Sequence, residues 1–406
     1  MRDYPVFIVS PKAEKSLRLG HPWVYADEIL SIDGQYENGD LVDVKGQKGT
    51  FLGTGFVNDV SKIRVRVISA NANDKFDEAF FARRIQYALE YRKHVMGNDF
   101  SACRLIFGES DQFPGLVVDR FGEVLVIQTM SLGMELRKSM IFELIVDGLR
   151  RMNQEISAIY ERCDVAVREL EGLSQFKGYY PMPGCSVETC SGHTEITENG
   201  IRFDVNYVDG QKTGYFLDQK YNRLAVMKLT QDKRVLDCCT HTGSFALHAA
   251  KGGAKHVTAL DISPLAIEQA KTNAARNNMH GIDFVCDNIF DFLTRHVETK
   301  TRAYDFIILD PPAFTKSHAT IRQAFNGYKE INRKAMRLLP RGGYLATCSC
   351  SHFMKDDMFR TMLAEAALDA NVMLRQVEAR QQSPDHPIVM SIPETNYLKF
   401  YLFQVV

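Results

Sequence analysis

Short apolar runs alternate with stretches of helical periodicity through the second half of the chain. The runs predict strands near residues 234–239, 256–260, 282–286, 304–309, 343–349, 372–379 and 397–405. Strands that alternate with helices are typical of a doubly wound parallel sheet. The pattern therefore predicts an α/β domain of the Rossmann type, which begins near residue 191 with a hairpin at the Asn199-Gly200 turn.

The first 72 residues show a different pattern, in which short strands are separated by glycines. We expect a small β-rich barrel or sandwich there. Around residues 62–67 the period of two places Lys62, Arg64 and Arg66 on one face of a strand and apolar residues on the other. These cations predict either a solvated face or a surface that follows the phosphates of RNA.

Residues 73–190 combine both patterns and predict an α+β middle domain. Helical spacing is strong from Asp77 to Met96 and returns from Gly133 to Met152. Strands are expected on both sides of the Pro114-Gly115 turn, at 158–162 and at 164–170. The stretch rich in Pro, Gly and Cys from Tyr180 to Cys190 indicates the boundary to the α/β domain.

Four consecutive strands of the α/β domain end on the carboxylates of Asp237, Asp261, Asp287 and Asp310. In an open α/β sheet, the crevice outside the carboxyl ends of the strands holds nucleotide-like ligands. After Asp237 the chain enters a helix at Gly243, where unpaired N–H groups face such a ligand. Asp261 is placed to accept both hydroxyls of a ribose. The acids therefore predict one ligand site, while the turn lacks the glycine spacing of dinucleotide folds.

The segment Asp310-Pro311-Pro312-Ala313-Phe314 carries chemistry that hydride transfer does not need. Its prolines stiffen the loop, which presents Asp310 to a planar base. Cys348 and Cys350 follow at the end of a later strand, where each is either a nucleophile or a buried small side chain. A thiolate that adds to C6 of a pyrimidine makes C5 nucleophilic, whereas an exocyclic amine needs no thiol. The residues predict a methyltransferase.

Composition predicts the number of domains and the cellular compartment. The chain has 406 residues, which predicts two or three domains, and its net charge of −1 provides no global basic field for nucleic acid. Nine cysteines in an α/β pattern indicate free thiols, and no apolar run is long enough for a membrane span. We expect a cytoplasmic protein without a membrane partner. Cys185, Cys190 and His193 fit no standard zinc spacing, so no metal is expected.

The motifs GQKTGYFLDQ, LDCCTHTGSFALHA, VTALDIS, DPPAF, GYKEIN, GGYLATCSCS, DHP and NYLK follow one another along the chain. Their order resembles the bacterial large-subunit ribosomal RNA cytosine-5 methyltransferases, and HPWVYADEI and GESDQFPGLVVDRFG extend the similarity to nearly the whole chain. The resemblance implies an RNA-binding PUA domain at 1–72, a middle domain at 73–190 and a class I methyltransferase domain at 191–406. It also implies a seven-stranded sheet with an antiparallel last strand, S-adenosylmethionine as cofactor and a cytosine in 23S rRNA as substrate.

The resemblance also implies roles for individual residues. Cys350 would be the nucleophile because it lies seven residues after the Gly342-Gly343 pair, although geometry alone does not separate it from Cys348. Asp310 would bind the N3/N4 edge of the cytosine. The cofactor would contact Asp237, Thr242, Gly243, Asp261, Ile262, Asp287, Asn288, Lys212, Thr213 and Tyr215. The RNA would contact Pro311, Pro312, Phe314, Lys62, Arg64 and Arg66, with Phe314 either stacked on the base or packed in the loop.

One departure and two alternatives remain open. Many RNA cytosine-5 methyltransferases place a second cysteine at the position of Ala313, so the group that removes the C5 proton is unassigned. One alternative is a methyltransferase for exocyclic nitrogens of guanine or adenine in rRNA. The other is a non-catalytic RNA-binding factor for ribosome assembly. The RNA partner would be naked 23S rRNA or a partly assembled large subunit, and a homodimer is left open.

Overall fold

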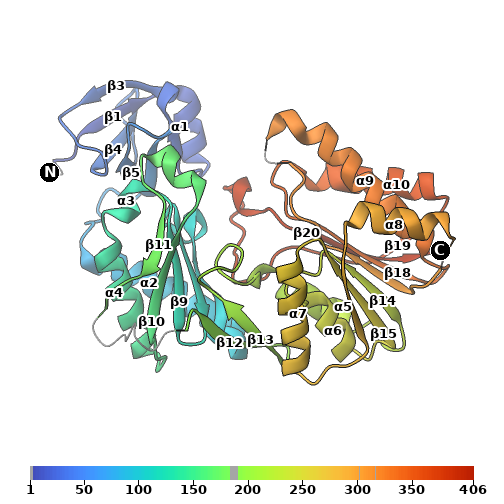
Figure 1. Ribbon diagram of the computed structural model, residues 1–406. Coiled ribbons are helices and arrows are strands. Elements are labelled where there is room, and N and C mark those ends of the chain that lie inside the picture. The colour runs from blue at the N-terminus through green and yellow to red at the C-terminus, as the bar shows by residue number, and fades with distance from the viewer. Residues whose placement is uncertain (1–2, 183–190, 301, 316) are drawn as a thin grey trace. The chain divides into compact units, whose positions relative to one another are not determined.

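The computed structural model describes residues 3–182, 191–300, 302–315 and 317–406 (Figure 1). Cys185 and Cys190 of the rejected zinc reading lie outside these residues. The chain divides into two compact units. Unit 1 comprises Met1–Ile196, Val205–Leu217 and Pro384–Thr395, and unit 2 comprises Thr197–Asp204, Asp218–Ser383 and Asn396–Val406. The predicted division into three domains stays a prediction, since the two units are discontinuous in sequence.

The first sheet of unit 1 is built from the glycine-punctuated strands at the N-terminus. It contains β1 (Val6–Val9), β2 (Trp23–Tyr25), β3 (Ile29–Asp33), β4 (Leu41–Gly46), β5 (Phe51–Val57) and β6 (Ile63–Ser69) in the order β2-β6-β5-β4-β1-β3. Helix α1 (Pro11–Arg18) begins at Ser10, whose hydroxyl accepts the Ala13 N–H. Phe7, Val24 and Val65 are fully buried in its core. The N-terminal segment is β-rich, as predicted.

The second sheet of unit 1 carries the predicted α+β character. It contains β7 (Ala102–Phe107), β8 (Leu116–Phe121), β9 (Val124–Thr129), β10 (Ala158–Cys163) and β11 (Phe176–Tyr179) in the order β11-β10-β9-β8-β7. Helices α2 (Glu78–Met96) and α4 (Lys138–Arg151) pack on one another. Strands β9 and β10 pair in parallel, and α4 makes the crossover that a parallel pair requires. The predicted helix at 133–152 is interrupted after α3 (Leu132–Glu135).

The strand predicted at 164–170 is wrong. Residues Ala166–Glu171 form a 3-10 helix that ends at Gly172, which has φ of +74°. The buried Arg168 explains the difference, because its guanidinium donates to the carbonyl oxygens of Thr129 and, at 2.8 Å, of Ser174. These bonds curl the segment, and the apolar Leu170 is left 67% exposed rather than packed on a sheet.

Unit 2 is organised around one large sheet, shown with its helices in Figure 1. It contains β14 (Arg234–Cys238), β15 (His256–Asp261), β16 (Ile282–Cys286), β17 (Phe306–Leu309), β18 (Tyr344–Ser349), β19 (Leu374–Arg380) and β20 (Lys399–Val405) in the order β16-β15-β14-β17-β18-β20-β19. Strand β20 runs antiparallel to both of its neighbours, and the other pairs are parallel. The predicted Rossmann-like sheet of seven strands with an antiparallel last strand is confirmed.

Both faces of this sheet are covered, which explains the continuous apolar runs in the sequence. On one face Leu236, Ile307 and Leu345 pack against α8 (Ile289–Glu298), α9 (Ile321–Leu338) and α10 (Asp356–Ala370). On the other face Val235, Ile308 and Ala346 pack against α5 (Lys220–Met227) and α6 (Ser244–Lys251). Helix α7 (Pro264–Arg276) lies along β15 and β16. The predicted hairpin forms as β12 (His193–Glu198) and β13 (Ile201–Asn206).

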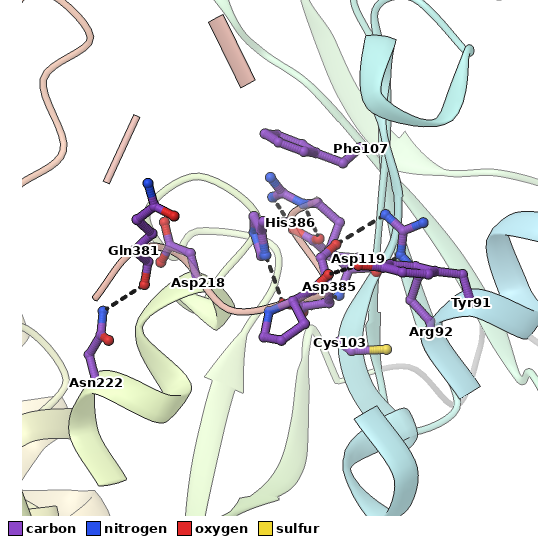
Figure 2. Close-up of polar contacts among 12 residues, drawn as sticks. Tyr91, Arg92, Cys103, Phe107, Asp119, Asp218, Asn222, Gln381, Asp385 and His386 are labelled. Atoms are coloured by element: carbon purple, nitrogen blue, oxygen red, sulfur yellow. Dashed lines mark hydrogen bonds and ion pairs between the residues drawn. The ribbon is translucent and has the colours of Figure 1, made fainter. Parts of the chain in front are cut away.

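Two segments within the predicted α/β region belong to unit 1. The carboxylate of Asp385 accepts the Arg104 backbone N–H at 2.8 Å, and Arg92 donates to the Asp385 carbonyl at 3.1 Å (Figure 2). The hydroxyl of Thr213 donates to buried Asp119 at 2.6 Å. Residues 205–217 and 384–395 are therefore part of the hydrogen-bond network of unit 1, which the sequence pattern did not indicate.

Candidate active site

The four strand-ending acids meet at one edge of the unit 2 sheet. Parallel pairing aligns β14 with β15 and β17, and it places Asp261 opposite Cys286, the residue before Asp287. Asp237 is fully buried, whereas Asp310 is partly exposed. A row of carboxylates at the carboxyl ends of parallel strands is the position at which α/β sheets bind ligands.

The turn between β14 and α6 is shaped by two of these acids. The Thr240 hydroxyl donates to Asp237 at 2.5 Å, and the His241 N–H donates to Asp261 at 2.9 Å. Gly243 has φ of +81°, and a Cβ there would lie 2.8 Å from the Leu247 side chain. Glycine is therefore required at the point where the turn enters the helix.

Asp237 and Thr242 have polar atoms that point to a missing partner. Among the described residues, Asp237 Oδ1 and Thr242 Oγ1 are buried without a hydrogen bond. Burial raises the pKa of Asp237 to about 8, and the charges of Asp310 and Asp261 add to the rise. A cationic N–H donor, such as the ammonium group of an amino acid, would satisfy this carboxyl group.

Asp261 keeps acceptor capacity for the hydroxyl groups of a ribose. Both oxygens of Asp261 accept backbone N–H groups at 2.9 Å, from His241 and Ser263, and each keeps a lone pair for a hydroxyl. Ile262 beside it is 66% exposed and offers an apolar surface to a base. Asp287 is paired with Arg295 and accepts the Asn288 N–H at 2.7 Å. The Asn288 side chain accepts the Phe290 N–H at 2.8 Å and caps α8. This donor and acceptor set fits an amino-acid nucleoside such as S-adenosylmethionine.

A chain of side-chain amides orients Asp310. Gln219 Nε2 donates to Asp310 Oδ1 at 3.1 Å, and Asn222 Nδ2 donates to Gln219 Oε1 at 2.7 Å. Arginine only donates, so the bond from Arg380 Nε to Asn222 Oδ1 at 3.1 Å fixes which way the amide faces. The bond from Asn222 to the Gln381 carbonyl at 3.2 Å agrees with that orientation (Figure 2). Gln219 is therefore held with an N–H toward the carboxylate.

The protonation of Asp310 is balanced close to neutral pH. Burial raises its pKa to about 6 together with the charge of Asp218, while Arg223 and Gln219 act in the opposite direction. Asp218 itself accepts the Tyr397 hydroxyl at 2.6 Å. The acid form of Asp310 is consequently accessible under physiological conditions.

The two thiols at the end of β18 have different surroundings. Cys348 is fully buried and lies opposite Phe400 in the pairing of β18 with β20. Burial and the charge of Asp310 raise its pKa, so this thiol holds its proton. Cys350 lies beyond the strand and is partly exposed. Cys350 is therefore the more accessible of the two thiols, and its role as the nucleophile stays a prediction.

The Cys350 loop is fastened to the Asp310 loop. The Ser351 hydroxyl donates to the Thr315 carbonyl at 3.0 Å. The Tyr328 hydroxyl on α9 accepts the Ser349 hydroxyl at 3.2 Å. The rings of Phe314 and Tyr328 lie 4.5 Å apart, so Phe314 packs its loop. Pro311 is buried and Pro312 is exposed.

The remaining residues predicted for the cofactor lie in unit 1. The Thr213 hydroxyl is taken up by Asp119, and Tyr215 is 3% exposed. The Lys212 ammonium lies 4.6 Å from the Phe216 ring centre. The strand-end acids belong to unit 2, and the contact of these three residues with the cofactor stays a prediction.

The basic residues predicted to follow RNA are largely paired with acids. Arg66 contacts Glu109 at 3.3 Å and Glu171 at 2.7 Å, and Arg64 contacts Asp59. Lys62 is exposed. The charge of Arg66 is thus neutralised within unit 1, and its predicted role toward RNA remains untested.

The site contains five residues that the sequence did not assign. They are Gln219, Asn222, Tyr328, Arg380 and Lys399. Gln219, Tyr328 and Lys399 stand in the motifs GQKTGYFLDQ, GYKEIN and NYLK, so a signal existed without a role. Asn222 and Arg380 reach Asp310 only through the folded chain, and the sequence pattern gives no sign of them.

The described residues were also compared with the requirements of a metal site and of a membrane-spanning helix. Within the described ranges, no group of three or more His, Cys, Asp and Glu side chains is arranged to hold a metal ion. Nor does a helix there have the length and apolar character needed to cross a membrane.

Known proteins resemble the chain over its full length. Residues 7–70 match the PUA-like domain family, and residues 149–404 match the S-adenosylmethionine-dependent methyltransferase family. Ribosomal RNA large subunit methyltransferase I from Pseudoalteromonas translucida is 40% identical over 397 residues, covering 97% of each chain. The protein of that name from Klebsiella pneumoniae is 37% identical over 405 residues, covering 99% of this chain and 98% of the relative.

Solved structures share the fold at lower identity. A Streptococcus mutans protein described as an S-adenosylmethionine-dependent methyltransferase has a TM-score of 0.80 at 22% identity, covering 98% of this chain and all of the other. A second protein, described as a methyltransferase and complexed with SAH, has a TM-score of 0.81 at 21% identity with the same coverage. Both show that the fold of this chain occurs in solved structures.

Proposed function

Because the chain belongs to the S-adenosylmethionine-dependent methyltransferase family that includes ribosomal RNA large subunit methyltransferase I, we propose that it methylates C5 of a cytosine in large-subunit rRNA. S-adenosylmethionine is the cofactor, and when bound it supplies the sulfonium methyl group. The observation that carries the proposal is the bond from the Ser351 hydroxyl to the Thr315 carbonyl, which joins the loop after the partly exposed Cys350 to the loop that follows Asp310.

Asp310 prepares the cytosine ring. Its acid form donates a proton to N3 while its carbonyl oxygen accepts from the exocyclic amine, and the raised pKa of about 6 keeps that form accessible. The chain from Arg380 through Asn222 and Gln219 holds the carboxyl group in place. A proton on N3 withdraws electrons from C6, which makes C6 the position for nucleophilic attack.

Cys350 supplies the nucleophile. Its thiolate forms a bond to C6, and the electron pair of the C5–C6 double bond makes C5 nucleophilic toward a methyl group. After transfer, the C5 proton leaves to a base and the carbon–sulfur bond breaks, which restores the double bond and the thiolate. Tyr328 and Ser351 keep the two loops in register during these steps.

At the cofactor end, Asp237 and Thr242 hold the amino-acid portion, and Asp261 holds the ribose hydroxyls. Gly243 lets the backbone turn close to the ligand. The PUA-like domain provides a second RNA contact surface.

The test is the variant Cys350→Ala, compared with Cys103→Ala, a buried thiol of unit 1. The substrate is 23S rRNA from cells that lack the protein, and the product is read as methylated nucleosides by mass spectrometry. We expect Cys350→Ala to lose at least about 1,000-fold in rate while its affinity for S-adenosylmethionine stays within about twofold. Cys103→Ala should keep its activity.

RNA that carries 5-fluorocytosine gives a second readout, because fluorine at C5 cannot leave as a proton. The wild-type protein should remain covalently attached to this RNA on a denaturing gel, and Cys350→Ala should not. Unchanged methylation by Cys350→Ala with a methyl group on an exocyclic amine would contradict the proposal and favour nitrogen methylation.

A further inference from the structure

Lys399 is a buried ammonium next to the Cys350 loop. The residue is 6% exposed, and its Nζ donates to the Ser351 carbonyl at 2.6 Å and to the Tyr397 carbonyl at 2.8 Å. An ammonium group has three donors, and within the described residues these two carbonyls are its hydrogen-bond acceptors. A buried cation without a carboxylate partner is costly, so a further anion is expected nearby.

The fold places Lys399 beside the nucleophile. In the β18–β20 ladder Lys399 lies opposite Ser349, and Ser351, which accepts its hydrogen bond, follows Cys350 directly. Burial lowers the pKa of Lys399 to about 8, and the main opposing influence is the negative charge of the Cys350 thiolate. The charges of Lys399 and Cys350 therefore influence one another.

The other titratable groups around Lys399 and Cys350 either have a hydrogen-bond partner or keep their protons. Asp356 on α10, the second influence that raises the pKa of Lys399, accepts the Tyr401 hydroxyl at 2.6 Å. Burial raises the pKa of Tyr328 on α9, so its hydroxyl stays neutral. Cys348 holds its proton next to Asp310. Lys399 is the cation in this group, and its Nζ donates to the residue that follows Cys350.

We propose that Lys399 is a catalytic residue that takes the proton of the Cys350 thiol and holds the resulting thiolate. The neutral amine accepts the sulfhydryl proton, which gives an ammonium and a thiolate with no change in total charge. The thiolate electron pair then forms the bond to C6, and the same ion pair is restored when the cysteine is eliminated. The use of this thiolate in methylation rests on the proposed function.

The test measures the reactivity of the thiol without RNA or cofactor. Full-length protein is alkylated with iodoacetamide from pH 5.5 to 10, and the labelled cysteines are quantified by peptide mass spectrometry. Exposed Cys286 in the same digest is the internal reference. In the wild-type protein the midpoint for Cys350 should lie at least about one pH unit below that for Cys286.

Lys399→Met should slow alkylation of Cys350 at pH 7 by about tenfold or more and raise its midpoint by about one unit or more, with Cys286 unchanged. Lys399→Arg keeps the cation and should retain a low midpoint. Lys334→Met is the matched control, since Lys334 on α9 is 9% exposed and pairs with Glu330. It should leave both cysteines unchanged.

Equal midpoints for Cys350 and Cys286 in the wild-type protein would overturn the role of Lys399, and this measurement needs no variant to fold. An unchanged Cys350 rate in folded Lys399→Met would overturn it as well. The RNA assay with Cys350→Ala is separate. A reactive Cys350 together with methylation that ignores Cys350→Ala would refute the proposed function and leave the lysine–cysteine pair in place.

Discussion

The acids at the strand ends of unit 2 and the cations of β6 in unit 1 look alike in the sequence, since both are charged residues in a regular pattern. In the fold they differ. Asp237 has a buried oxygen without a partner among the described residues, whereas Arg66 lies against Glu109 and Glu171. The type of a charged residue is therefore readable from sequence, but its availability to a ligand depends on what the fold packs against it.

The largest expected effect concerns the unpartnered acid. Asp237→Asn should weaken S-adenosylmethionine binding by about 100-fold or more, because removing one partner of a buried charge pair costs about 3–5 kcal/mol. Isothermal titration calorimetry measures this affinity. A loss of less than fivefold would show that the Asp237 carboxyl group is already satisfied within the protein.

The raised pKa of Asp237 predicts the direction in which stability and cofactor affinity change with pH. Its folded pKa of about 8 lies above the ordinary value of 3.8, so the unliganded folded state holds the proton longer than the unfolded chain. This contribution to stability is complete below pH 3.8 and is lost as pH rises through 8. Unliganded Asp237→Asn should lack this pH dependence, and wild-type affinity for the cofactor should increase from pH 6 to 8 by up to about tenfold per unit.

The same distinction explains how much of the fold could be predicted. The strands of unit 2 are buried on both faces, so each appears as an apolar run, and their order follows from alternation with helices. The conformation of residues 166–171 was not predicted because the buried bond from Arg168 to the Thr129 carbonyl determines it. The place of residues 384–395 in unit 1 was not predicted because it depends on the bond between Asp385 and Arg104. Such bonds depend on partners far away in the chain.

The candidate site divides in the same way. Asp237, Asp261 and Asp310 were predictable because a strand presents its last residue at the sheet edge. Strand geometry could not separate Cys348 from Cys350, so the choice of Cys350 rested on its offset from Gly342-Gly343. In the fold the two thiols differ by their neighbours in space. The surroundings that favour Cys350 come from α9 and β20, which no local pattern connects to it.

Arg66 is the paired cation in this comparison. Arg66→Met should lower the free energy of unfolding by about 3 kcal/mol, because it leaves two partly buried carboxylates without their cation. Urea denaturation measures the change. Exposed Lys62→Ala is the control and should change stability by less than about 0.5 kcal/mol. If Arg66→Met instead weakened RNA binding and left stability intact, β6 would be the phosphate surface that its sequence pattern allows.

The smallest expected effect is a shift of the kcat/KM profile along the pH axis. It is also the most specific effect, because two variants should shift the profile in opposite directions. Gln219 donates to Asp310 and lowers its pKa, whereas the charge of Asp218 raises it. Gln219→Met should therefore move the alkaline limb of the kcat/KM profile up by about 0.5–1 pH unit, and Asp218→Asn should move it down by a similar amount. General damage to the loop would lower kcat in both variants without separating the limbs. Limbs that move in the same direction would mean that Asp310 does not act through its acid form, and a carboxyl group held by Gln219 would then serve only to position the base.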